Sequence, residues 1–94
     1  DADDINAKIS GSGDILLEGE ADQLVLTISG SGDFRAFNLP LRSANVTISG
    51  SGDVDVRVED ELDVRISGSG DVSYKGNPRV DARVSGSGRV VNAN

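Results

Sequence analysis

The hexapeptide Ile-Ser-Gly-Ser-Gly-Asp occurs four times in the chain, and an altered fifth copy, Val-Ser-Gly-Ser-Gly-Arg, lies near its end. The copies begin at residues 9, 28, 48, 66 and 84, so the intervals between them are 19, 20, 18 and 18 residues. A regular interval of this length is typical of solenoid proteins, in which each repeat forms one turn of a coil.

Between the copies, apolar and polar residues alternate, as they do in strands that bury one face. Residues 54–58 and 62–66 alternate in this way, and residues 59–61 between them are predicted to form a turn. The other repeats have turns predicted at residues 19–22, around Pro40 and at residues 76–78. No window shows the helical period of about 3.6 residues, so each repeat is predicted to contain two strands and two corners.

A meander of β-hairpins would also contain short glycine-rich turns. It does not explain why successive repeats match position by position, whereas a coil stacks equivalent residues at about 4.8 Å. We therefore predict an all-β fold, a single-stranded right-handed parallel β-helix (β-solenoid) with five coils of 18–20 residues. Two predicted interior columns are Ile9, Ile28, Ile48, Ile66 and Val84, and Ile15, Phe34, Val54, Val72 and Val90.

In this arrangement each hexapeptide is a corner of the coil. Glycine suits a corner because it adopts backbone angles closed to other residues and lets neighbouring coils approach closely. The predicted corner glycines are Gly11, Gly13, Gly30, Gly32, Gly50, Gly52, Gly68, Gly70, Gly86 and Gly88. The serines are predicted to form two hydroxyl columns, in which each hydroxyl donates to one neighbour and accepts from the next. They are Ser10, Ser29, Ser49, Ser67 and Ser85, and Ser12, Ser31, Ser51, Ser69 and Ser87.

The last residues of the hexapeptides are predicted to form an acidic column. Its members are Asp14, Asp33, Asp53 and Asp71, with Arg89 in the fifth place. In the simplest interpretation each carboxylate caps backbone amides at its corner and stays solvated. The alternative is a cation ladder, since calcium-binding β-rolls have a nonapeptide repeat, half the 18-residue interval seen here. Because the aspartate here directly follows the second glycine, unlike in that repeat, we predict no specific metal site.

No residue pattern indicates catalysis or a cofactor. The chain has no His and no Cys, which removes the commonest general base, the commonest metal ligand and thiol chemistry. The hexapeptides lack the Lys-Ser/Thr of a phosphate-binding loop. A glycosidase needs two carboxylates at a set separation, whereas the outward acids alternate with arginines as on a solvated, salt-bridged face. Those residues are Asp55, Asp63, Asp81, Arg57, Arg65 and Arg83. Tyr74 is predicted to be a column member with its hydroxyl outward, and a sugar-stacking role is the alternative.

The net charge of −7 argues against nucleic acid and against an anionic membrane surface as partners. No apolar run is long enough for insertion into a membrane. The chain begins with Asp, and we expect residues 1–94 to be a single β-solenoid domain, a processed or excised piece of a longer β-helix domain. Because the sequence shows no capping element, self-association through the solenoid ends is also expected.

Residues 9–91 resemble the head GIN domain family, whose bacterial envelope proteins are labelled "putative auto-transporter adhesins". The resemblance rests on the iterated SGSGD and on SYKGNPRV at Ser73–Val80, which runs into VSGSG at Val84–Gly88. It implies a right-handed β-helix, a chain that corresponds to the C-terminal half of the family's domain, and export to the periplasm, outer membrane or cell surface. It implies no catalytic residues.

These observations favour a non-enzymatic cell-envelope interaction module, an adhesin-like β-helix that binds a protein or glycan. One alternative is a purely structural spacer or assembly unit of a surface protein. Another is a cation-binding or carbohydrate-active β-helix.

Overall fold

Eight β-strands follow the alternating segments of the sequence in the computed structural model, which describes residues 4–19 and 21–92. They are β1 (Asp4–Gly11), β2 (Asp14–Glu18), β3 (Gln23–Gly30), β4 (Asp33–Gly50), β5 (Asp53–Gly68), β6 (Asp71–Lys75), β7 (Arg79–Gly86) and β8 (Arg89–Asn92). Strands end at the first glycine of each hexapeptide and begin again at its last residue. Within the described part of the chain, no helix is long and apolar enough to cross a membrane.

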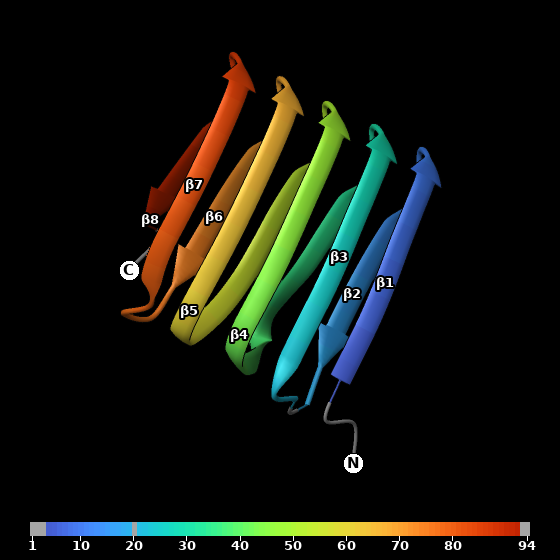
Figure 1. Ribbon diagram of the computed structural model, residues 1–94. Helices are drawn as coiled ribbons and strands as arrows, with labels where there is room; N and C mark the ends of the chain where they lie inside the picture. Colours follow the sequence, from blue (N-terminus) through green and yellow to red (C-terminus); the bar gives the residue numbers. More distant parts are fainter. Residues whose placement is uncertain (1–3, 20, 93–94) are drawn as a thin grey trace.

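Every strand pairing between described residues is parallel. Each residue pairs with its counterpart one repeat further on, as Ile28 does with Ile48 and Ile48 with Ile66. Because hairpins pair antiparallel, this register excludes the meander. In Figure 1 the near strands rise and the far strands descend as the chain advances from N to C, so the coil is right-handed. The predicted β-solenoid of about five turns is confirmed.

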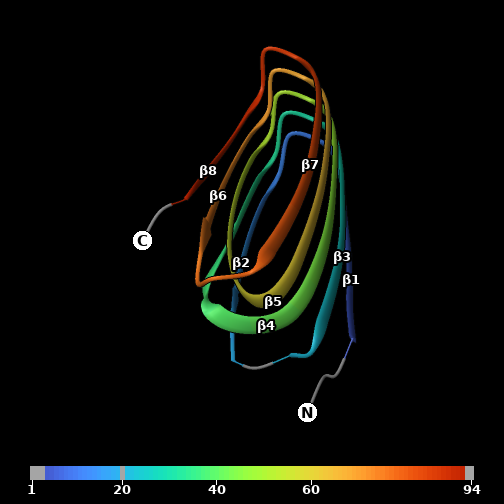
Figure 2. The same cartoon turned by 60° about the vertical axis from the view of Figure 1, so that its left-hand side comes forward.

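The coils have two long faces. Face 1 contains β1, β3, residues 43–50 of β4, residues 61–68 of β5, and β7. Face 2 contains β2, residues 33–41 of β4, residues 53–58 of β5, β6 and β8. Figure 2 shows the coils as flattened loops stacked along one axis, with the hexapeptide corner at the top of each loop. The hexapeptide corner therefore joins face 1 to face 2 in every coil.

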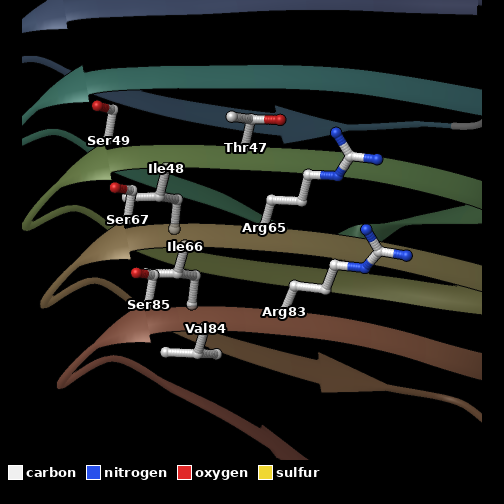
Figure 3. Close-up of a pocket in the computed structure, with 9 residues that line it drawn as sticks. All are labelled: Thr47, Ile48, Ser49, Arg65, Ile66, Ser67, Arg83, Val84 and Ser85. Carbon is white, nitrogen blue, oxygen red and sulfur yellow. The ribbon is translucent and has the colours of Figure 1, made fainter.

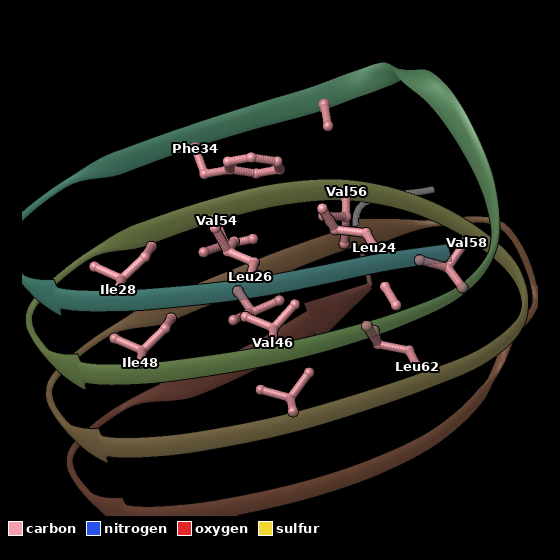
Figure 4. Close-up of a cluster of buried hydrophobic side chains, with 14 of the residues drawn as sticks. Leu24, Leu26, Ile28, Phe34, Val46, Ile48, Val54, Val56, Val58 and Leu62 are labelled. Atoms are coloured by element: carbon pink, nitrogen blue, oxygen red, sulfur yellow. The ribbon is translucent and has the colours of Figure 1, made fainter. Parts of the chain in front are cut away.

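The core lies between the two faces and consists of aliphatic side chains and one phenylalanine (Figure 4). Both predicted columns are present in the register, and their middle members are buried. The described residues include no buried polar or charged side chain. Burial of apolar surface between the faces is therefore the main source of stability, at about 25 cal/mol per Å².

The second corner of the coil differs from the prediction in two repeats. The turns predicted around Pro40 and at residues 59–61 lie inside the long strands β4 and β5, which bend without leaving the ladder. The register shifts between Ala36 and Pro40 and again before Ser43, so that Leu39 and Leu41 fill the inside of the bend. A parallel ladder can follow a bend because its partner coil bends with it. The turns predicted at residues 19–22 and 76–78 do interrupt the strands, and Gly19 and Gly76 there have positive φ angles.

The two ends of the stack are not equivalent. Ile9 in the first coil is 4% exposed, whereas its counterpart in the last coil, Val84, is 41% exposed. The isoleucines of this column lean toward the following coil. A β-carbon built at Gly32, in the second coil, would have Ile9 of the first coil as its nearest side chain, and one built at Gly88, in the last coil, would have Ile66 of the coil before. The following coil therefore covers each member, and among the described residues none covers Val84.

Candidate functional site

The first glycine of each hexapeptide sits at the bend with a backbone conformation that other residues rarely adopt. The φ angles are 92° at Gly11, 122° at Gly30, 134° at Gly50, 132° at Gly68 and 127° at Gly86. No described residue other than glycine has a positive φ angle. A side chain at these positions would strain the backbone.

The second glycine of each hexapeptide lies against the coil before it. A β-carbon built at Gly52 would lie 2.7 Å from the carbonyl oxygen of Gly32 and 2.9 Å from a methyl carbon of Ile28. At Gly13, in the first coil, the nearest such atom is a methyl carbon of Ile9 at 3.9 Å. Glycine is thus required at this position because of the neighbouring coil.

Backbone hydrogen bonds join one corner to the next. Ser51 N–H donates to the Gly30 carbonyl over 2.9 Å, and Asp53 N–H donates to the Gly32 carbonyl over 3.0 Å. The same pair of bonds recurs between the other successive corners. These amides are satisfied by carbonyls of the previous coil, so they do not need the aspartate carboxylates as caps, which differs from the simplest sequence interpretation.

The aspartates of the hexapeptides form an outward row on face 2. Asp14 pairs with Asp33, Asp33 with Asp53, Asp53 with Asp71, and Asp71 with Arg89. At the strand spacing of about 4.8 Å, neighbouring carboxylates repel by about 1 kcal/mol in water. Arg89 faces only the last of them.

The acidic row borders an open groove of about 290 Å³, and Asp55 is half-buried beside it. Burial raises the pKa of the Asp55 carboxyl, the neighbouring Arg35 opposes that rise, and Asp53 and Asp33 add to it. Among residues 4–19 and 21–92, no group of three or more acidic side chains is arranged to hold a metal ion. Cation binding by this row therefore has no support from the geometry.

Calcium is expected to change the thermal stability of the domain little. A site filled at 100 times its Kd would stabilise the fold by about 2.7 kcal/mol, which would raise the Tm by about 10–20 °C. We expect a rise below about 2 °C in millimolar calcium, the same in magnesium, because divalent ions only screen the acidic row. A large, saturable, calcium-selective rise that disappears in Asp33→Asn or Asp53→Asn would contradict this.

Asp55→Asn is expected to stabilise the domain more at about pH 7 than at about pH 3. The folded-state pKa of Asp55 is raised above 3.8, so the folded protein binds this proton more tightly than the unfolded chain. The stability that the group contributes is fully present below the unfolded pKa and is lost as the pH rises through the folded pKa. The difference in Tm between the variant and the native protein should grow across this range. A difference that is constant or shrinks would contradict the raised pKa.

A second groove, of about 400 Å³, lies on face 1 across β4, β5 and β7 (Figure 3). A row of hydroxyls lines one side, a row with two arginines lines the other, and the strands form the floor between them. The hydroxyl row is Ser49, Ser67 and Ser85, and the arginine row is Thr47, Arg65 and Arg83. The floor residues are Ile48, Ile66 and Val84. Sequence reasoning identified the serines but not the groove. The sequence signal that could have predicted the groove is a Thr or Arg two residues before the serine in each of these three repeats.

Two rows of outward residues on face 1 each bring together charges of like sign. Asp63 pairs with Asp81, and Arg65 pairs with Arg83. Acids and arginines that alternate along one strand are therefore sorted into separate rows across the coils, because the register is exact from repeat to repeat. The interpretation as an alternating salt-bridged face does not describe the contacts between coils in these two rows, whereas on face 2 Asp55 does pair with Arg35.

Other outward positions vary from coil to coil. One row on face 2 contains Leu16, Arg35, Asp55, Ser73 and Val91, five different residue types in register. The Lys75 ammonium lies 4.5 Å from the centre of the Phe37 ring, a cation–π contact on the same side of the molecule. Tyr74 pairs with Val56 and is half-buried against the core, as expected for a column member.

Parallel coils with glycine corners, an aliphatic interior and open faces with regular rows define a β-helix whose polar chemistry lies on its surface. The chain belongs to the family described as "Putative auto-transporter adhesin, head GIN domain", whose model matches residues 1–78. The resemblance inferred from the repeats is thereby confirmed. The match begins before residue 9 and ends before the last hexapeptide. That the chain corresponds to the C-terminal half of the family's domain stays a prediction.

The solved structures that are similar to this chain include three from bacteria of the genera Parabacteroides and Bacteroides. A "putative adhesin" from Parabacteroides merdae is 31% identical with a TM-score of 0.94, and the match covers 98% of this chain and 39% of that chain. A "putative lipid binding protein" from Parabacteroides distasonis is 33% identical with a TM-score of 0.96, and the match covers 98% of this chain and 37% of that chain. A "putative adhesin" from Bacteroides fragilis is 30% identical with a TM-score of 0.89, and the match covers 96% of this chain and 42% of that chain. The chain spans about two fifths of the length of these relatives. No curated protein matches the sequence.

Proposed function

We propose that the protein is a non-enzymatic, adhesin-like interaction module that lies outside the cytoplasm of a bacterium and binds a protein or a glycan. The adhesin family and the adhesin-like relatives support an envelope module of this kind. The proposal treats residues 1–94 as one solenoid domain, part of a longer β-helix.

The observation that carries the proposal is the set of outward rows on two flat faces. Each row presents side chains at a fixed spacing of about 4.8 Å from a rigid ladder, which suits recognition of an extended partner. The described residues bury no polar or charged side chain, so the polar side chains lie on the outside, where a partner can reach them. The exposed large apolar residues do not form one broad patch on either face, which favours a protein or glycan over a lipid. They are Leu16, Val25, Val80, Val84 and Val91.

The test is a glycan array combined with pull-down of surface proteins, both with the intact parent protein. We expect a ligand whose binding is weakened by substitutions of outward residues on one face, with the fold retained by circular dichroism. The absence of any bound glycan or protein would contradict the proposal.

The exposed last coil favours a second candidate, an assembly unit that stacks on another copy of itself. Val84 and Val80 are 41% and 36% exposed, and among the described strands β7 is paired on one side only, with β5. Because −7 charges per chain repel at low salt, association should strengthen as salt is added. Sedimentation of the 94-residue chain over a concentration series at low and moderate salt tests this. A strict monomer at every concentration would exclude it.

A further inference from the structure

We propose that the groove on face 1 between the hydroxyl row and the arginine row binds an acidic saccharide, that is, a chain of sugar rings with carboxylate groups. This inference rests on the proposed function and names the ligand class for one of the two faces.

The floor of the groove leaves recognition to the two rows. Ile48 and Ile66 are 0% and 2% exposed, so neither their side chains nor their backbone offers much surface to a ligand. That backbone pairs with the neighbouring coils in the parallel ladder, which occupies its donors and acceptors. Polar contacts to a ligand must therefore come from the side chains on the two sides.

The arginine row supplies an unbalanced pair of positive charges. Arg65 and Arg83 occupy paired positions on β5 and β7, and their exposed side chains extend in parallel (Figure 3). Two cations about 4.8 Å apart repel by about 1 kcal/mol in water. A carboxylate that accepts hydrogen bonds from both guanidinium groups converts this repulsion into attraction, and arginine forms such bonds with favourable planar geometry.

Charges elsewhere on the face leave the groove side of this row open. The acids of the same strands, Asp63 and Asp81, stand two residues before the arginines, on the side away from the serines. Neither acid lines the groove. The charged side chains that line the groove are therefore the two arginines, so a bound carboxylate is attracted there although the whole chain is acidic.

The hydroxyl row distinguishes a saccharide from other anions. Ser49, Ser67 and Ser85 are all exposed and repeat at the strand spacing. Each hydroxyl both donates and accepts, which matches the hydroxyls of a sugar. Val84 lines the groove at the last coil and adds an apolar contact for the C–H face of a ring. A volume of about 400 Å³ lies within the range of small-ligand sites.

The test measures binding of three probes by calorimetry or surface plasmon resonance. The probes are an oligogalacturonate, the same oligosaccharide with its carboxylates methyl-esterified, and a poly-glutamate peptide of similar charge. We expect the oligogalacturonate to bind, the ester to bind about tenfold more weakly or worse, and the peptide to bind less well than the oligogalacturonate. Binding should weaken with added salt.

Two matched double variants locate the site. Arg65→Gln with Arg83→Gln should weaken oligogalacturonate binding by about tenfold or more. Arg35→Gln with Arg57→Gln changes the net charge equally on face 2 and should leave binding within about twofold, by the same conversion. Ser67→Ala should weaken binding of the oligosaccharide but not of the peptide. All these side chains are exposed or border solvent, and thermal melts check that the fold is kept.

Three outcomes would overturn the inference: no binding of the oligogalacturonate, equal loss in both double variants, or peptide binding as tight as saccharide binding. Each is distinguishable from failure of the proposed function. If the array finds a neutral glycan or a protein whose binding ignores the Arg65 and Arg83 substitutions, the interaction module stands and the acidic-saccharide groove does not.

Discussion

Val56→Asp is expected to unfold the domain at room temperature. Val56 is 0% exposed and lies in the core between the two faces, where the described residues provide no polar partner. An unpaired carboxylate in such a place costs several kcal/mol. Domains of this size have a total stability of about 5–15 kcal/mol, so most of it would be lost. Far-ultraviolet circular dichroism with a thermal melt should show no cooperative transition, or a Tm far below that of the native protein.

The matched control is Asp55→Asn, one residue earlier on the same strand. Asp55 points outward and is half-buried, and its neutral replacement should be tolerated or slightly stabilising at neutral pH. Equal thermal stability of Val56→Asp and Asp55→Asn would show that the assignment of inward and outward positions is wrong.

Gly52→Ala is expected to destabilise the domain by about 3 kcal/mol, which corresponds to a fall in Tm of about 12–24 °C. The added methyl group would lie 2.7 Å from the Gly32 carbonyl oxygen, which accepts the hydrogen bond from Asp53 N–H. The Gly32 carbonyl cannot move without weakening this hydrogen bond, and Ile28 is 0% exposed in the core, so its methyl group has little room to shift.

Gly13→Ala occupies the same place in the hexapeptide and provides the control. Its added methyl group would meet only a methyl carbon of Ile9, at 3.9 Å, and its φ angle is not in the left-handed region. The change should stay within about 1 kcal/mol of neutral, since alanine also restricts the unfolded chain. If the two variants melted at the same temperature, close approach of the coils would not explain the second glycine.

The hexapeptides made the register of the fold predictable from the sequence. Identical residues at Ile28, Ile48 and Ile66 can be aligned by eye, and once they are stacked every other residue of the two faces follows. The parallel pairing and the interior columns were accessible for the same reason, because alternation with period two determines which side chains point inward.

The second corner was not predictable in the same way. Glycine and proline near a bend usually indicate an interruption, but in β4 the chain absorbs Pro40 through a shift in register, and Leu39 rather than Phe37 enters the core. Local sequence does not encode this, because the shift is set by what the neighbouring coils leave room for. Considering each strand by itself also failed to predict the rows of like charge on face 1. Asp63 and Arg65 look paired along β5, whereas the neighbours that the fold gives them are Asp81 and Arg83.

The row of Leu16, Arg35, Asp55, Ser73 and Val91 has a consequence for how such a protein can diversify. The five positions are equivalent in the backbone, yet each coil places a different side chain there without disturbing the ladder. The interior and the glycine corners between coils tolerate little change, because each is packed against a neighbouring coil. Mutations can therefore rewrite the outer faces one coil at a time while the scaffold stays constant. New binding specificities can arise on this fold without passing through an unstable intermediate.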